Sequence, residues 1–392
     1  MKHDSHLRSA LLVLHDYDGS IPLAAFLKSF FRLHPNMGSR DRKSIASLVY
    51  NYYRLGHALQ HVLEEERLLA AAFLCNDQPS ELLAYFHPAW ADMGTVTLEK
   101  KLAYLQSQGL PVQPEEIFPW RQWLSPGISF DDFAHSFLRQ PDVYLRIRSH
   151  RDDIIRLLQA HHIPFTEKDH DCIALPNGTK ATHLIPEKSW YEVQDDSSRK
   201  VARYFNDLDM LQKQPAPLVW DCCAGSGGKS ILLHDRFPDV RLVVSDVRPS
   251  ILHNLQQRFR EAGVSAEYCT TADLEKGLPA AFKKMPFSLI MADVPCSGSG
   301  TWARTPERLF FFEPASLEHF TARQKHICNH ALKALRKGSG FLYITCSVFH
   351  AENGDMVTYL RSQAGLRLLR SGLLKGYDDR ADNLFAAAFI LE

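Results

Sequence analysis

Two cysteines and an aspartate stand where they could do chemistry together. Asp293 and Cys296 follow the apolar run Pro286 to Met291, and Cys346 ends a second apolar run that begins at Gly340. Both runs are typical of buried strands, and open α/β sheets bind their ligands at the carboxyl ends of the strands. We therefore expect two thiols and a carboxylate to face one crevice.

Two thiols and an acid suit a particular reaction on pyrimidines. Carbon 5 of a pyrimidine is a poor nucleophile, but a thiolate added at carbon 6 makes it enamine-like, able to attack the methyl group of a sulfonium donor. Asp293 could protonate or hydrogen-bond the ring nitrogen, and a second group must help to eliminate the enzyme afterwards. One buried cysteine is usually an inert hydrophobe, whereas two at strand ends favour this chemistry.

A glycine-rich turn from Asp221 to Ser230 predicts a cofactor site. It follows a strand and opens a helix, where glycines let a cofactor approach the backbone. Asp246 ends the next strand, from which a carboxylate accepts bonds from ribose hydroxyls, and Asp273 ends the third, near an adenine or its ribose. A phosphate-binding P-loop is disfavoured because Cys223 replaces a required glycine, and a nicotinamide site because the turn is not Gly-x-Gly-x-x-Gly.

The second half of the chain predicts the sheet that would hold these residues. From Trp190 onward strands alternate with helices, which indicates a doubly wound, mostly parallel, Rossmann-like sheet. We expect helices near Gly228, Pro249, Ser316 and Asn353, and strands at Leu218–Trp220, Arg241–Ser245, Glu267–Thr270, Phe287–Ala292 and Gly340–Thr345. The tail, Leu384–Leu391, is expected to form a final edge strand.

The first half predicts two further domains. Apolar residues recur at helical spacing and indicate an all-helical domain over residues 1–127, ending in a connector rich in Pro and Trp. Residues 128–186 predict a small α/β domain, and residues 187–392 form the doubly wound domain. The basic helix Ser39–Arg54 is either a solvated face or an RNA-contacting one. Arginines of the small domain would suit phosphate contacts: Arg146, Arg148, Arg151 and Arg156.

Composition bounds the class of protein. The 392 residues are 45% hydrophobic and 23% charged, which indicates a folded globular chain. Eight cysteines without a Cys-x-x-Cys pair predict neither a disulfide framework nor a metal site, so we expect a reducing compartment. No signal-like or membrane-spanning apolar run is seen, which predicts a soluble cytoplasmic protein without a membrane partner, expected to be a monomer. Equal numbers of basic and acidic residues, 45 each, still permit a local basic face.

Longer motifs resemble a known family. Asp293 to Glu307, with Thr345-Cys-Ser347 and Glu352-Asn353, resembles the Sun/Fmu (RsmB-like) family of RNA cytosine-5 methyltransferases. The resemblance extends to the glycine-rich turn, Gln194–Ser198, Asp382–Phe385 and, more loosely, Ser39–Arg54. It thus implies a methyltransferase sheet behind two accessory domains that place the RNA.

The resemblance also implies roles for individual residues. Cys346 would form the covalent adduct with the cytosine, Cys296 would assist its breakdown, and Asp293 would contact the base. S-adenosylmethionine would be the cofactor, held by Cys223, Ala224, Gly225, Ser226, Gly227, Gly228, Lys229, Asp246, Arg248, Asp273 and Asp293. The target cytosine would be unpaired or flipped. Ribosomal RNA is the expected substrate, and transfer RNA is the alternative.

One departure from the family bears on the cofactor. Gly225-Ser226 replaces the usual Ala-Pro, so the turn is expected to be more flexible and to bind the cofactor less tightly. The alternative from another class is therefore a non-catalytic RNA-binding or ribosome-assembly factor that no longer holds the donor. A DNA cytosine methyltransferase is disfavoured, because those enzymes use the cysteine of the Pro-Cys element as nucleophile and lack the Thr-Cys-Ser partner.

Overall fold

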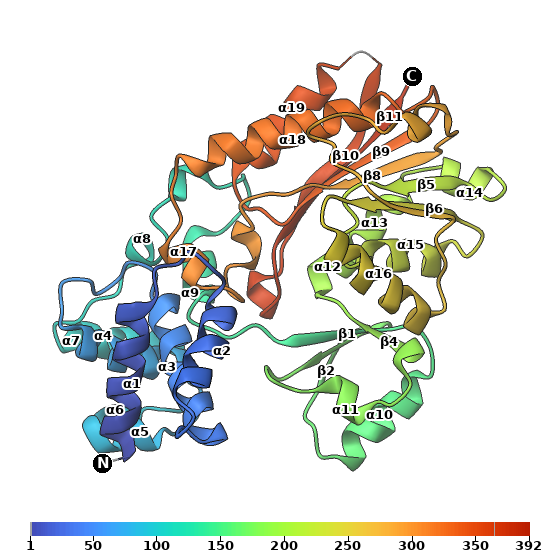
Figure 1. Ribbon diagram of the computed structural model, residues 1–392. Helices are drawn as coiled ribbons and strands as arrows, with labels where there is room; N and C mark the ends of the chain where they lie inside the picture. The colour runs from blue at the N-terminus through green and yellow to red at the C-terminus, as the bar shows by residue number, and fades with distance from the viewer. Residues whose placement is uncertain (1, 364) are drawn as a thin grey trace. The chain divides into compact units, whose positions relative to one another are not determined.

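The computed structural model describes residues 2–363 and 365–392, and these divide into two compact units (Figure 1). The first unit holds residues up to 124, 128–140 and 301–313, and the second holds 125–127, 141–300 and 314–392. Residues 128–140 thus group with the helical unit, whereas the sequence assigned them to the small α/β domain. No helix in the described residues is long and apolar enough to cross a membrane.

The first unit is helical, as the sequence predicts. Its helices are α1 (Lys2–Asp16), α2 (Leu23–Leu33), α3 (Ser39–Arg54), α4 (Glu64–Cys75), α5 (Glu81–Phe86), α6 (Pro88–Asp92), α7 (Leu98–Ser107), α8 (Pro114–Ile117), η1 (Arg121–Trp123), α9 (Phe130–Ser136) and α17 (Glu307–Phe310). The buried Arg67 guanidinium donates to the carbonyls of Gly56 (2.6 Å) and Ala58 (2.8 Å). It thereby satisfies two backbone carbonyls of the segment that joins α3 to α4.

A small antiparallel sheet begins the second unit. In the described residues its order is β2-β3-β1-β4, with β1 (Val143–Ile147), β2 (Thr166–Asp169), β3 (Cys172–Leu175), β4 (Tyr191–Val193), α10 (Arg151–Ala160), α11 (Ala181–Leu184) and η2 (Lys188–Trp190). The sequence predicted β1, β3 and α10 but missed β2 and β4. β2 is exposed throughout and reads Thr-Glu-Lys-Asp, so it carries no apolar alternation to recognise.

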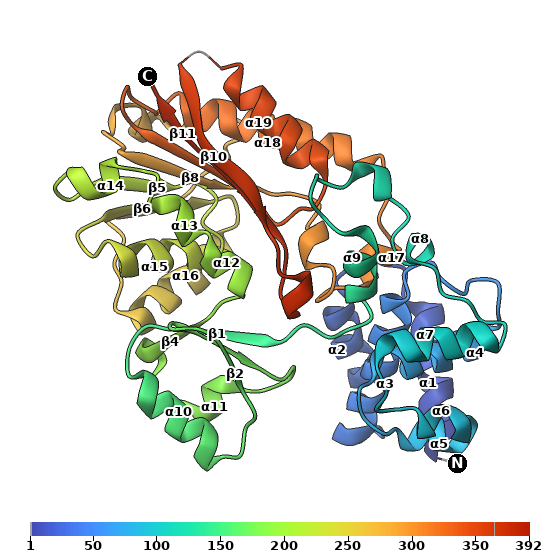
Figure 2. The same ribbon diagram turned by 180° about the vertical axis from the view of Figure 1, so that it is seen from behind.

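A larger mixed sheet forms the centre of the second unit (Figure 2). Among the described residues it has seven strands in the order β10-β11-β9-β8-β5-β6-β7: β5 (Leu218–Asp221), β6 (Arg241–Asp246), β7 (Tyr268–Thr271), β8 (Leu289–Asp293), β9 (Gly340–Thr345), β10 (Leu366–Leu374) and β11 (Leu384–Leu391). β7, β6, β5, β8 and β9 run parallel. The strand order reverses between β5 and β8, which is where such sheets bind ligands.

The predicted position of the tail strand is wrong. β11 is not an edge strand but lies between β9 and β10, antiparallel to both. Its residues are buried from Leu384 to Phe389, as an interior strand requires. β10 is the edge strand instead. Its arginines and leucines are mostly exposed or half-buried, and the sequence did not identify it as a strand.

Helices cover both faces of the large sheet (Figure 1). One face carries α12 (Asp196–Lys200), α13 (Ala202–Phe205), α14 (Met210–Lys213), α15 (Gly228–Arg236) and α16 (Pro249–Ala262). The other carries η3 (Ala280–Lys284), α18 (Ser316–Leu332), η5 (His350–Glu352) and α19 (Gly354–Arg361). Two further short helices are η4 (Ser299–Thr301), after β8, and η6 (Tyr377–Asp379), before β11. Strand residues alternate between the two cores: Val219 packs with α15 and α16, and Trp220 with α18 and α19. The predicted doubly wound fold is confirmed.

Candidate active site

The two predicted thiols meet at the ends of neighbouring strands. β8 pairs in parallel with β9, placing Asp293 beside Ile344. Three residues past β8 and one past β9, the sulfur atoms of Cys296 and Cys346 lie 3.3 Å apart and are half-buried. Residues 50 positions apart in the sequence are thus brought into one crevice, as the strand ends predict.

The surroundings of Cys296 favour the protonated form of its thiol. The hydrogen bond with Cys346, together with burial, raises the pKa of Cys296 well above its ordinary value. A thiol that keeps its proton can donate in this bond, and either sulfur atom can serve as the donor. A protonated Cys296 is a poor nucleophile, because the thiolate is the reactive form of cysteine.

A cation lies beside this pair. Lys229, on the first turn of α15, donates from Nζ to Oδ2 of Asp293 at 2.7 Å. Burial acts to lower the pKa of Lys229, but the charge and hydrogen bond of Asp293 outweigh it, so the pKa is raised. The Cys346 thiolate form adds to that increase. By reciprocity, the ammonium stabilises negative charge on the Cys346 sulfur.

A fully buried carboxylate, Glu352, links the two cysteine loops. Its Oε2 accepts from the hydroxyls of Ser297 and Ser347, both at 2.5 Å, and its Oε1 accepts from the Ser297 backbone at 2.9 Å. Gln324 donates to the same Oε1 at 2.9 Å. Because Ser297 follows Cys296 and Ser347 follows Cys346, this network fixes both thiols. The sequence motif included Glu352 without a role, since no spacing pattern shows that it bridges these loops.

The glycine-rich turn approaches the end of β6 closely. The Gly225 backbone donates to Oδ2 of Asp246 at 3.0 Å, and Gly225 and Gly227 have φ angles of +52° and +82°. A Cβ at Gly227 would lie 2.6 Å from the Phe259 ring, so glycine is required there for space as well as for conformation. The turn therefore begins α15 directly beside the second strand's carboxylate.

A pocket opens at the ends of β6 and β7. It is lined by Cys222, Cys223, Asp246, Val247, Ala272, Asp273, Leu274, Glu275, Pro295, Arg323 and Ile327. Burial raises the pKa of Asp246, but hydrogen bonds from Arg248 outweigh it and keep the pKa low; a bond from Lys276 lowers that of Asp273. Two ionised carboxylates beside an apolar wall fit a nucleoside, with ribose hydroxyls as donors. Arg248 acts on this pocket through Asp246.

Ser226 and Gly228 are not among the residues that line that pocket. Arg258 of α16 donates from Nη1 to the Ser226 hydroxyl at 2.9 Å and from Nε to Glu192 of β4 at 2.8 Å. The Gln194 side chain donates to the Gly228 carbonyl at 3.2 Å. The residue that replaces the family's proline is thus anchored to the strand of the small sheet, a contact that the sequence did not predict and that opposes the expected loosening of the turn.

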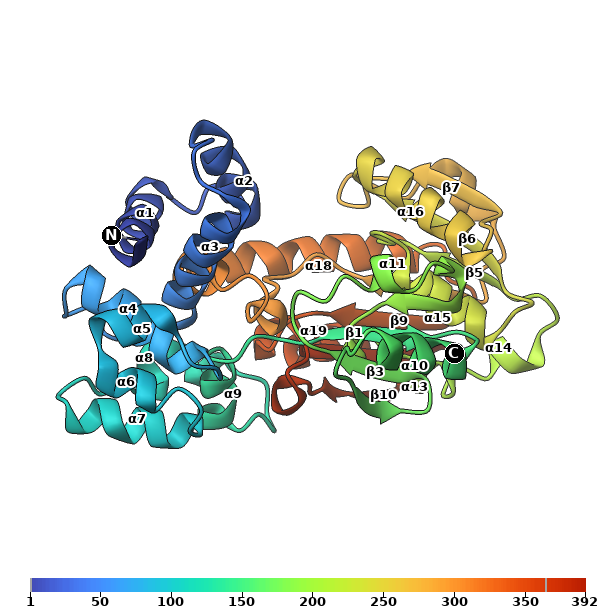
Figure 3. The same ribbon diagram turned by 90° about the horizontal axis from the view of Figure 1, so that it is seen from below.

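The arginines of the small domain are engaged by carboxylates. Arg146 and Arg148 both pair with Asp235 of α15, at 2.5 Å and 2.7 Å, and Figure 3 shows the small sheet beside that helix. Arg151 pairs with Glu167, and Arg156 with Asp153 at 2.5 Å. Arg146 and Arg148 hold the small sheet to the large one and are not available to phosphates, so this expectation is corrected for both.

The fold and site together define a class of protein. A doubly wound sheet with a glycine-rich turn after its first parallel strand, carboxylates at the next strand ends and a thiol pair at the switch point is that of a methyltransferase carrying two strand-end cysteines. Residues 208–379, which include the turn and both thiols, match the model of a family described as 16S rRNA methyltransferase RsmB/F. Residues 208–379 of this chain are thus similar to the RsmB/F family.

The chain is also similar to individual proteins. The chain is similar to ribosomal RNA small subunit methyltransferase B of Shewanella oneidensis, with 26% identity over 227 residues, covering 56% of this chain and 50% of the relative. It thus spans about half the length of that curated relative. Two crystal structures share the fold: PH0851, with TM-score 0.66, 15% identity and 94% of each chain covered, and NSun6 from Pyrococcus horikoshii with SFG, with TM-score 0.56, 13% identity and coverage of 71% of this chain and 96% of that one.

Proposed function

We propose that this protein transfers a methyl group from S-adenosylmethionine to carbon 5 of a cytosine in structured RNA, through a covalent cysteine–cytosine adduct. The observation that carries the proposal is the 3.3 Å approach of Cys296 and Cys346 beside Asp293. A single strand-end cysteine would fit many roles, but two thiols 3.3 Å apart fit addition followed by elimination. The match of residues 208–379 to the RsmB/F family model supports the same reaction.

The chain's own residues fit the cofactor. Asp246 would accept hydrogen bonds from the ribose, Asp273 would lie at the adenine end, and the backbone from Cys223 to Gly228 would approach the remainder. When bound, S-adenosylmethionine supplies an electrophilic methyl group on sulfur. Lys229 holds Asp293 in place at the edge of the same crevice.

The protein residues would then act in sequence on the base. The Cys346 thiolate would attack carbon 6, forming the carbon–sulfur bond and opening the double bond between carbons 5 and 6, while Asp293 in its carboxylic acid form donates its proton to the ring nitrogen that takes up the displaced electrons. After the methyl group is attached to carbon 5, that carbon loses its proton to a base and the carbon–sulfur bond breaks. Cys296, still protonated, donates a hydrogen bond to the departing Cys346 sulfur.

Ribosomal RNA is the proposed substrate. The family description and the name of the Shewanella oneidensis relative both refer to ribosomal RNA, which supports it. Transfer RNA is the alternative, because the matched region covers the methyltransferase sheet rather than the helical unit. We further propose that the helical unit and the small sheet place the RNA for the reaction, and that the protein works as a monomer in the cytoplasm.

Trapping the adduct tests the proposal. Cys296→Ala, expressed with an affinity tag in its native host and purified under denaturing conditions, should retain covalently bound RNA whose sequence names the substrate. The matched control is Cys296→Ala with Cys346→Ala, which should retain none. If no RNA is trapped and calorimetry shows no binding of S-adenosylmethionine to the wild type, the non-catalytic RNA-binding factor replaces this proposal.

A further inference from the structure

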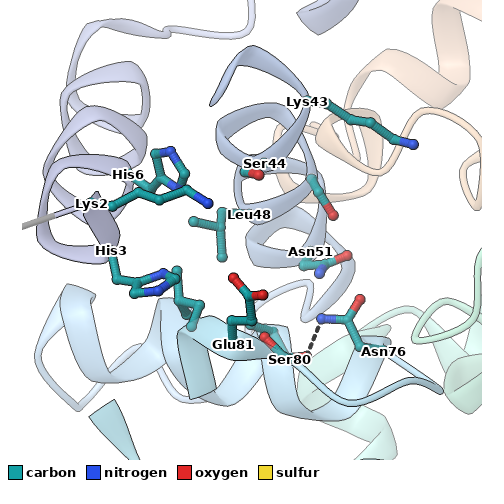
Figure 4. Close-up of a pocket in the computed structure, with 13 residues that line it drawn as sticks. Lys2, His3, His6, Lys43, Ser44, Leu48, Asn51, Asn76, Ser80 and Glu81 are labelled. Atoms are coloured by element: carbon teal, nitrogen blue, oxygen red, sulfur yellow. Dashed lines mark hydrogen bonds between the residues drawn. The ribbon is translucent and has the colours of Figure 1, made fainter. Parts of the chain in front are cut away.

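A polar cavity of about 350 Å³ lies inside the helical unit, between α1, α3, α4 and α5 (Figure 4). This volume is within the range of small-molecule sites. Most of its lining is polar: Lys2, His3, His6, Lys43, Ser44, Ser47, Asn51, Asn76, Ser80 and Glu81, with Leu48, Ala72 and Leu82 completing the wall. None of these residues belongs to the methyl-transfer site.

Asn51 is the unusual member of this lining. Its side chain has no exposed surface, and neither the amide nitrogen nor the amide oxygen has a hydrogen-bond partner among the described residues. Buried amides are almost always paired, because an unpaired one loses its bonds to water without replacement. The neighbouring Asn76, by contrast, donates to the carbonyl of Ala72 at 2.7 Å. Asn51 therefore presents one free donor and one free acceptor at the cavity wall.

The remaining groups define what could pair with that amide. Figure 4 shows the Lys2 ammonium and the Glu81 carboxylate both pointing into the space in front of α3. Leu48 and Leu82 add apolar surface on which a flat ring could rest. A fitting ligand has an anionic group for Lys2 and an amino group for Glu81. It also has a planar heterocycle that carries a hydrogen-bond acceptor beside a hydrogen-bond donor, to pair with the Asn51 amide.

We infer that this cavity binds one unpaired nucleotide of an RNA, with adenine or cytosine as its base. Both bases carry an exocyclic amine beside a ring-nitrogen acceptor, so the amide of Asn51 can donate to the ring nitrogen and accept from the amine. Glu81 accepts the amine's second hydrogen, and Lys2 contacts the phosphate. Uracil offers a carbonyl where cytosine offers the amine, so Glu81 disfavours it.

This inference rests on the proposed function in one respect, because an RNA substrate is what would bring a nucleotide to the cavity. Single-stranded RNA is commonly recognised by bases splayed out into such pockets. Since the Asn51 amide is enclosed, the side chains around it have to adjust as the base enters. The energy of that pairing would offset the cost of keeping an unpaired amide in the free protein.

Calorimetric titration of the full chain with CMP and UMP tests the inference without requiring catalysis. Wild type should bind CMP at least about tenfold more tightly than UMP, and Asn51→Leu should lose that preference while binding S-adenosylmethionine unchanged. The matched control is Gln108→Leu, which removes an exposed amide of the same unit and should keep the preference for CMP. Asp293→Ala should also keep it, because that variant impairs only the proposed methyl-transfer site.

The stability of the variant supplies a second readout. Asn51→Leu should melt at the same temperature as wild type or higher, since it removes an unsatisfied buried amide. Equal CMP binding by wild type and Asn51→Leu, or a preference lost in Asp293→Ala alone, would overturn the inference. Failure of adduct trapping together with an Asn51-dependent preference for CMP would leave the cavity site standing and remove the proposed methyl transfer.

Discussion

The thiol crevice and the glycine-rich turn lie at the same edge of the large sheet but are held in different ways. In the crevice the bonds are short and buried, and they converge on Glu352, which is 0% exposed. At the turn, Ser226 is held by Arg258, whose side chain is 25% exposed and whose other bond goes to β4 of the small sheet. The crevice is thus organised from within its own sheet, whereas the turn depends on a neighbouring one.

This difference predicts that variants of the crevice change the rate of methyl transfer, whereas variants of the turn change the affinity for the cofactor. Changes within the crevice should slow the chemical steps and leave cofactor binding intact, because the Glu352 network and the Arg258 contacts involve different residues. Changes at the anchor should weaken cofactor binding and leave the rate at saturation nearly unchanged. Four variants can break or sharpen the comparison.

Cys346→Ala should have the largest effect. Without the thiolate no adduct forms at carbon 6, so methyl transfer should fall by at least about 1,000-fold, measured with labelled S-adenosylmethionine on the trapped RNA. Cys328→Ala, which removes a buried thiol from the core under α18, is the control and should retain most activity. An active Cys346→Ala, with adduct formation lost in Cys296→Ala, would reverse the two roles.

Glu352→Gln should come next. The amide nitrogen cannot accept from the serine hydroxyls, so one link between the cysteine loops is lost. We expect kcat to fall by about 10- to 100-fold through misplacement of the thiols. The free energy of unfolding should fall by about 1–3 kcal/mol, measured by urea denaturation. KM for the cofactor should hold steady. The control is Glu318→Gln, at an exposed position on α18, which should match wild type in kcat, in the free energy of unfolding and in KM for the cofactor. If KM for the cofactor changed in Glu352→Gln but not in this control, the crevice would affect cofactor affinity as well as rate.

Arg258→Ala should act on affinity instead. Losing the bond to Ser226 frees the turn, so the dissociation constant for S-adenosylmethionine should rise by about fivefold or more, with kcat at saturation little changed. Ser226→Ala should produce a similar rise, and the double variant no more than either alone. Arg260→Ala, exposed on the same helix, is the control. Additive effects of the two changes would mean that Arg258 acts by another route.

The sequence and the structure agree where local pattern is enough. Strand ends and chain order placed Asp293, Cys296 and Cys346 at neighbouring positions, because parallel strands end at one edge. The bridging role of Glu352 and the anchor from Arg258 to Ser226 leave no local pattern, since each joins segments that meet only after folding. The position of β11 was mistaken for the same reason: strand order is decided by pairing with β10, whose half-polar sequence gives little signal.

Asp221, at the end of β5 before the turn, gives an expected effect on stability rather than on activity, and this effect depends on pH. Burial raises the pKa of Asp221 to about 7, although a hydrogen bond from the Ser230 hydroxyl opposes the increase. A raised pKa means that the fold favours the protonated form. Protonated Asp221 therefore makes its full contribution to stability below the ordinary aspartate pKa. As the pH rises towards 7 this contribution is lost, and the free energy of unfolding falls by at most about 1.4 kcal/mol per pH unit.

Asp221→Asn imitates the protonated form and should remove that slope. The melting temperature of wild type should fall relative to that of Asp221→Asn between pH 5 and pH 7, and the difference should level off above pH 8. Comparing the two proteins at each pH cancels the other titrating groups, and Asp239→Asn, outside the site, should run parallel to wild type. A constant difference between wild type and Asp221→Asn across this range would mean that Asp221 is ionised in the folded protein throughout. The turn would then rest on a buried charge, and Lys229 would have to balance both Asp221 and Asp293.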